Sequence, residues 1–115
     1  MHLLFIFSIS LILSISVAFG GMPGGWSEAN PTDPNVISIA KFAIESKYGN
    51  AAVLKKVKTA FTQVVRGINY DLKVETNMVK DESCVAEKYV VWDDLGKRKL
   101  ISHEFLVEDC NHGDQ

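Results

Sequence analysis

The chain has 115 residues, of which 47% are hydrophobic, and carries a formal net charge of −2. This length supports one domain with one modest core. The near balance of 12 basic and 14 acidic residues gives no broad basic field. We therefore expect no nucleic-acid partner bound through phosphate neutralisation, and no firm electrostatic hold on anionic lipid.

The amino-terminal segment is apolar, and the first Asp, Glu, Lys or Arg of the chain is Glu28. Residues 3–19 form a hydrophobic run, and the small residues Ala18 and Gly20 precede a possible cut before Gly21. This pattern predicts that residues 1–20 are a signal peptide and that the cleaved protein is secreted, extracellular and free of the membrane. The alternative is an uncleaved membrane anchor, since a run of 17 residues is at the lower edge of a spanning length.

Two cysteines, Cys84 and Cys110, lie 26 residues apart. Export to an oxidising compartment favours a disulfide between them. The alternative is an exported enzyme that uses Cys84 as a nucleophile with His103 or His112 as its partner, and it requires a free thiol. The His residues are too scattered for a zinc cluster, so we expect no metal and no cofactor.

Gly, Pro, Ser and Asn dominate residues 21–33, which predicts a flexible amino-terminal arm. Asp33 followed by Pro34 is a helix-start signal, and Gly49-Asn50 is a stop signal. Between them, apolar residues recur at spacings of three and four, which predicts an amphipathic helix with one buried face. That face contains Val36, Ile39, Ala40, Ala43 and Ile44.

After Asn50 the hydrophobic period changes from helical to alternating, which is typical of half-buried strands. The alternation predicts inward side chains at Val57, Thr59 and Phe61, and then at the even positions Ile68, Tyr70, Leu72 and Val74. Since odd positions give way to even ones, a turn or bulge is expected between Gln63 and Gly67.

Two further strands are predicted at residues 84–92 and 100–107. Residues 76–83 are polar and predict a connection before the first of them, and residues 93–97 have the composition of a hairpin turn. The fold class is therefore α+β, with a four- to five-stranded antiparallel sheet wrapped on one α-helix in a domain spanning residues 34–115.

Three segments are apolar or glycine-rich where polar turn residues are usual: residues 22–26, residues 63–67 and Val91-Trp92. Successive hairpin turns of an antiparallel sheet lie at alternating ends, so these three segments can share one end of the domain. An exposed apolar wedge of that kind indicates a binding site.

At these positions the chain resembles a cystatin, the family of reversible inhibitors of papain-like cysteine proteases. Residues 63–67 match the Q-x-V-x-G motif of the family's first loop, and Ile68-Asn69-Tyr70 resembles its continuation into a strand. The stretch from Ile39 to Ile44 is similar to the family's helix, and Gly24-Gly25 stands where its amino-terminal glycine precedes that helix. The similarity covers nearly all of residues 22–110, which are taken as the inhibitory unit.

The resemblance implies a secreted, reversible, tight-binding inhibitor of papain-like cysteine endopeptidases of the cathepsin type, monomeric and not an enzyme. It resembles a type-2 cystatin that keeps one disulfide, because Cys84 and Cys110 resemble the carboxy-terminal pair and the other pair is missing. The family's protease-binding positions fall on Gly24, Gln63, Val64, Val65, Arg66, Gly67 and Trp92.

Two departures from the family pattern affect the second loop. Val91 stands where proline usually precedes the tryptophan, and Trp92 lies further from Leu100 than the pattern suggests. Asp93 or Asp94 at the tip, with Trp92 buried in the sheet, is therefore an alternative. The alternative function is that of a diverged secreted protein of the same fold, such as a venom, salivary or antimicrobial component, that binds a non-protease partner.

Overall fold

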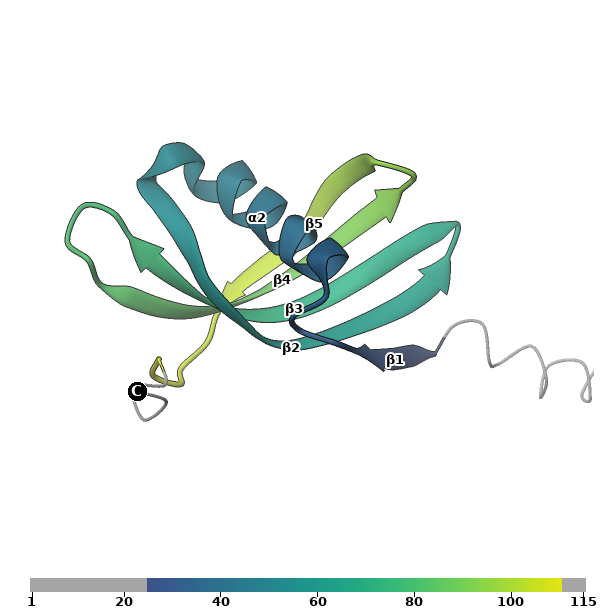
Figure 1. Cartoon of the computed structure of the whole chain (residues 1–115), viewed down its shortest axis with the longest axis horizontal. Coiled ribbons are helices and arrows are strands. Elements are labelled where there is room, and N and C mark those ends of the chain that lie inside the picture. Colours follow the sequence, from purple (N-terminus) through teal and green to yellow (C-terminus); the bar gives the residue numbers. More distant parts are fainter. Residues whose placement is uncertain (1–24, 111–115) are drawn as a thin grey trace, which may run out of the picture.

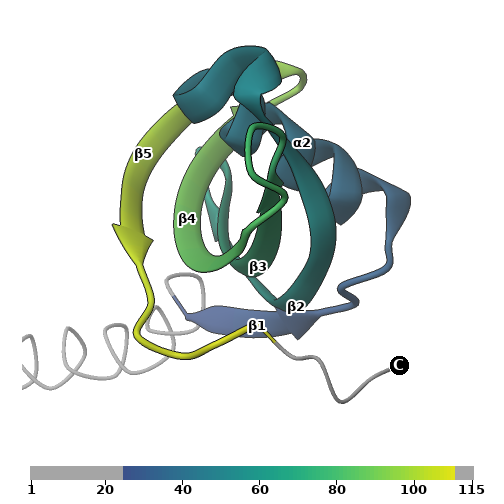
Figure 2. The same ribbon diagram turned by 90° about the vertical axis from the view of Figure 1, so that its left-hand side faces the viewer.

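The computed structural model describes residues 25–110, which form one helix and one sheet. Five strands pair in sequence order, each antiparallel to its neighbour. Figure 1 shows the helix α2 lying across one face of the sheet, and Figure 2 shows the strands curling around it. The predicted α+β fold is confirmed. The elements are β1 (Trp26–Ala29), α2 (Pro34–Tyr48), a 3-10 turn η2 (Gly49–Ala51), β2 (Ala52–Val65), β3 (Gly67–Met78), β4 (Cys84–Asp94) and β5 (Lys97–Phe105).

Helix α2 begins and ends where its capping residues predict. The Asp33 carboxylate accepts a hydrogen bond from the backbone N–H of Asn35, and Pro34 occupies the first turn. At the other end, Gly49 adopts a φ of 61° and donates its N–H to the carbonyl of Glu45. All five apolar residues predicted for the inner face are buried. No helix within residues 25–110 is long and apolar enough to cross a membrane.

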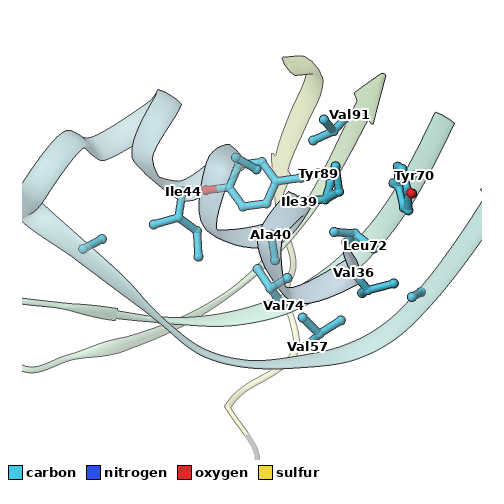
Figure 3. Packing of buried hydrophobic residues seen from close by; sticks show 13 residues of the cluster. Val36, Ile39, Ala40, Ile44, Val57, Tyr70, Leu72, Val74, Tyr89 and Val91 are labelled. Atoms are coloured by element: carbon cyan, nitrogen blue, oxygen red, sulfur yellow. The ribbon is translucent and has the colours of Figure 1, made fainter. Parts of the chain in front are cut away.

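The core lies between α2 and the concave face of the sheet (Figure 3). Strand β3 contributes Tyr70, Leu72 and Val74, as its alternation predicts, and β4 contributes Tyr89 and Val91. Ile39 is the largest fully buried side chain of α2. These residues fix the distance between the helix and the two central strands.

The predicted inward face of β2 is wrong after Val57. Thr59 is exposed and Phe61 is 36% exposed, whereas Ala60 is buried. The reason is a register irregularity between Val57 and Thr59, where β2 carries one more residue than its partner strand. A bulge of this kind moves every following side chain to the other face of the sheet.

The predicted arm over residues 21–33 is also wrong in part, because Trp26–Ala29 form β1. This strand pairs with β2, with Trp26 opposite Gln63 and Ala29 opposite Ala60. Backbone hydrogen bonds to the edge of β2 stabilise it, and they leave little mark on side-chain composition. The predicted signal peptide, residues 1–20, lies outside the described residues, as does Gly24.

The strands are also longer than predicted around the two later turns. Strand β3 continues to Met78 and includes the buried Thr76, which shortens the predicted connection to residues 79–83.

The predicted disulfide is present and joins Cys84, at the start of β4, to Cys110 beyond β5, with their Cα atoms 6.2 Å apart. This bond anchors the chain that leaves the edge strand.

A buried carboxylate links the helix to β4 and β5. Glu87 has no exposed surface, and its Oε1 accepts from the Tyr48 hydroxyl at 2.5 Å and lies 2.7 Å from His103 Nε2. Its Oε2 accepts from the Tyr89 hydroxyl at 3.1 Å. Burial, together with this carboxylate, raises the pKa of both tyrosines above the ordinary value.

We predict that none of the three tyrosines titrates at its ordinary pH of about 10 while the protein is folded. Burial also raises the pKa of Tyr70, with Asp93 and Asp33 adding to the effect. Because the folded-state values are raised, the stability that the neutral tyrosines contribute is complete below about pH 10 and is lost as the pH rises beyond it. Tyrosinate absorbance should therefore appear together with loss of the circular dichroism signal. A reversible tyrosinate signal near pH 10 in a protein with native dichroism contradicts this prediction.

Candidate functional site

The two turns and the start of β1 lie at one end of the sheet. Trp26 is opposite Gln63, so the chain enters β1 beside the β2–β3 turn (residues 65–67). Ile68 is opposite Asp93, and a Cβ built at Gly67 would lie 3.1 Å from Cβ of Asp94, so the β2–β3 turn lies beside the end of β4 that leads into the β4–β5 turn (residues 94–97). Figure 1 shows the start of β1 and both turns at this end, with the β3–β4 turn at the other. The structure thus brings together the described parts of the three predicted segments.

This end of the sheet exposes large apolar side chains. Val64 is 64% exposed, Val65 41%, Trp26 45% and Leu95 100%. We call these four residues the apolar end. Exposed apolar side chains gathered on one edge are typical of an interaction site.

Gly67 allows the two hairpins to approach closely. Its φ is 86°, in the region that side chains rarely adopt. A Cβ atom at this position would lie 2.7 Å from the backbone oxygen of Asp93 and 2.9 Å from Nε1 of Trp92. Glycine is therefore required for two reasons: the backbone angle at residue 67 is unfavourable for other residues, and β4 leaves no room for a side chain.

Trp92 joins the hairpins through a hydrogen bond. Its indole N–H donates to the carbonyl oxygen of Arg66 at 2.6 Å. The side chain is half-buried and belongs to β4, as predicted for residues 84–92, and it is not fully buried in the sheet. Asp93 and Asp94 are also strand residues, so the alternative that places one of them at the tip is wrong.

The residues that flank both turns are held by polar contacts. Asn69 donates from Nδ2 to Oε1 of Gln63 at 3.0 Å, which ties the two strands of the β2–β3 hairpin together. Arg98 Nε lies 2.9 Å from Oδ1 of Asp93, and its Nη1 donates to the Ser38 hydroxyl of α2. The β4–β5 hairpin is therefore anchored to the helix as well as to the sheet.

Sequence reasoning missed one member of the apolar end, Leu95. Leu95 occupies the β4–β5 turn with a φ of 53°, and Gly96 follows with 97°. An apolar residue directly before glycine in an otherwise polar turn was the available signal. Trp26 was included in an apolar segment, but its position opposite Gln63 depends on β1, which had not been predicted.

The enzyme alternative requires a free thiol, and neither cysteine has one. Cys84 is bonded to Cys110, which argues against a Cys84 nucleophile. The Glu75 carboxylate lies within 4.8 Å of both sulfur atoms and completes the group of metal-type ligands found within residues 25–110. Since the two sulfur atoms are bonded to each other, they do not offer thiolate ligands.

Replacing Gly67 with alanine should destabilise the protein more than the same change at Gly96. Both glycines have positive φ, but nothing lies within 4 Å of a Cβ built at Gly96. We expect Gly96→Ala to cost about 1–2 kcal/mol from its dihedral angle alone, and Gly67→Ala about 1–3 kcal/mol more from the clash with β4. Urea denaturation measures the difference, and equal losses in the two variants contradict the close approach.

Comparisons with known proteins agree with this architecture. A family model described as SQAPI, aspartic acid proteinase inhibitor, matches residues 29–106. The chain is 36% identical over 111 residues to cysteine proteinase inhibitor 5 of Arabidopsis thaliana, covering 89% of this chain and 88% of that protein. It is 41% identical over 71 residues to L-cystatin of Tachypleus tridentatus, covering 57% of this chain and 53%, about half, of that protein.

Solved cystatin structures share the fold. The salivary cystatin of the soft tick Ornithodoros moubata superposes with a TM-score of 0.64 at 23% identity, covering 73% of this chain and 98% of that one. Dimeric human cystatin F gives a TM-score of 0.64 at 16% identity, covering 78% of this chain and 90% of that one. With its motif, its fold and these relatives, the chain belongs to the cystatin family.

Proposed function

We propose that the chain is a secreted, reversible, tight-binding inhibitor of papain-like cysteine endopeptidases of the cathepsin type. It acts as a monomer and without catalysis. The observation that carries the proposal is the apolar end, where two hairpin turns and the start of β1 lie side by side on one edge of the sheet. The names of the relatives, cystatin and cysteine proteinase inhibitor, support the same class of target.

In this proposal the edge enters the active-site cleft as a preformed wedge. Val64 and Val65 supply buried apolar area, and Gly67 keeps the backbone of the turn narrow. Gln63 and Arg66 complete the first contact segment, Trp92 belongs to the second, and Gly24 leads the amino-terminal residues along the other side of the cleft. Little ordering is required on binding, which favours high affinity.

Inhibition of aspartic proteinases is a second candidate function. It is favoured by the family model, whose description names that class and whose match includes both turns. The two candidates are separated by titrating papain and pepsin with the same preparation. Inhibition of neither protease would favour the non-protease partner.

Titration of papain with the mature chain should give stoichiometric loss of activity that is recovered on dilution. The double variant Val64→Asp/Val65→Asp should weaken inhibition at least about 100-fold, because two charges are forced into an apolar contact. The matched control is Val79→Asp, an exposed valine in the β3–β4 turn at the opposite end of the sheet.

The control should inhibit papain like the parent chain, and both variants should retain its circular dichroism spectrum. If micromolar parent protein leaves papain fully active, the proposed function is wrong. If the control loses as much affinity as the double variant, the assignment of the inhibitory surface to the apolar end is wrong.

The secreted state has its own test. The full chain expressed in a secretory host should appear in the medium with Gly21 as its first residue, because the small residues before it suit signal peptidase. Amino-terminal sequencing or intact mass determines this. Protein that remains in the membrane fraction with its first 20 residues contradicts the prediction.

A further inference from the structure

We propose that Leu95 is the protease-contacting residue of the β4–β5 turn, and that Trp92 is a positioning residue that holds the β2–β3 turn level with it. This inference rests on the proposed function and assigns roles within the same site. It departs from the expectation that Trp92 makes the contact.

Leu95 is fully exposed and has an unfavourable backbone conformation. Its exposed fraction is 100%, and its φ of 53° lies in the left-handed region that leucine rarely adopts. The side chain therefore adds nothing to the core, while a turn of this kind is normally built from Gly, Asn or Asp. A strained, exposed apolar residue on a binding edge indicates a role in contact rather than in folding.

The register places the β4–β5 turn beside the first contact segment. Ile68 pairs with Asp93, and Asp94 pairs with Lys97 as the last rung before the turn. A Cβ built at Gly67 would lie 3.1 Å from Cβ of Asp94, the residue before Leu95, so the β2–β3 turn lies beside the base of the β4–β5 turn. One flat partner surface can therefore meet both turns together.

Trp92 is set back from the β4–β5 turn. It lies within β4, two residues before the end of the strand, whereas Leu95 lies in the turn beyond that end. Its indole N–H is already used by the carbonyl oxygen of Arg66, and the ring lies against the position that a Cβ of Gly67 would occupy. The side chain is thus placed to determine where the β2–β3 turn lies, not to reach a partner.

These positions predict the chemistry of the recognised surface. Leu95 lies between Asp94 and Gly96, with Lys97 next in the chain, so a complementary surface would have an aliphatic depression with a polar rim. We therefore expect Leu95 to select among papain-like proteases according to the apolar character of the surface beside the cleft.

The test compares Leu95→Asp, Leu95→Met and Trp92→Phe in papain inhibition, with Val79→Asp as the control. Leu95→Asp should raise the inhibition constant about 30-fold or more, and Leu95→Met should stay within about threefold because it keeps an apolar side chain. Trp92→Phe keeps a ring but loses the N–H, and should raise the constant about tenfold.

A spectroscopic readout separates positioning from contact. In the free chain the indole hydrogen of Trp92 should exchange with solvent more slowly than that of the exposed Trp26, because only Trp92 has the Arg66 carbonyl as acceptor. On adding papain, the Leu95 methyl resonances should shift strongly, and the Trp92 indole resonance should shift less.

Three other outcomes contradict the inference, and each identifies the part that is wrong. If Leu95→Asp inhibits like the parent chain while Val64→Asp/Val65→Asp does not, the role of Leu95 is wrong and the proposed function remains. If the Trp92 indole shifts more than the Leu95 methyls, Trp92 is the contact. If the parent chain does not inhibit papain, the proposed function fails and this inference with it.

Discussion

The close approach between Gly67 and the end of β4 is the constraint on which the candidate site depends. A side chain at residue 67 would meet the backbone of Asp93, and the Trp92 indole closes the remaining gap by donating to Arg66. Two turns that are separate in sequence are thereby held as one body. Their apolar residues are thereby held in a fixed arrangement, which lowers the conformational entropy that the proposed binding would cost.

The fold supports this arrangement from behind. The bulge near Lys58 increases the twist of β2, and the sheet curls around α2 (Figure 2). At one end of α2, Ser38 accepts from Arg98 and so fixes the β4–β5 hairpin. At the other end, Tyr48 donates to the buried Glu87 carboxylate and fixes the centre of β4. The edge that carries the turns is thus rigid because both ends of one helix are bound to the same hairpin.

Sequence patterns within single elements predicted α2 and β3. The bulge in β2 and the strand β1, which depend on a neighbouring strand, were missed. Asp33, Pro34 and Gly49 act within one turn of the helix, so its ends could be read directly. The bulge in β2 depends on the partner strand, and β1 depends on the backbone edge of β2; neither has a side-chain pattern of its own.

The candidate site was predicted for one hairpin and only partly for the other. A motif marks Gln63 and Gly67, whereas the position of Leu95 follows from where β4 ends, and the length of that strand was underestimated. Trp92 was recognised as important, but its hydrogen bond to Arg66 follows from a contact between residues 26 positions apart in the chain.

The central claim is that the end bearing both turns is the surface that enters a protease cleft. Amide hydrogen exchange of the mature chain, free and saturated with papain, tests it most directly. We expect slower exchange at Trp26, at residues 64–67 and at residues 94–97, with no change at residues 79–83. Slower exchange confined to residues 79–83 or to the exposed edge of β5, with both turns unchanged, contradicts the account.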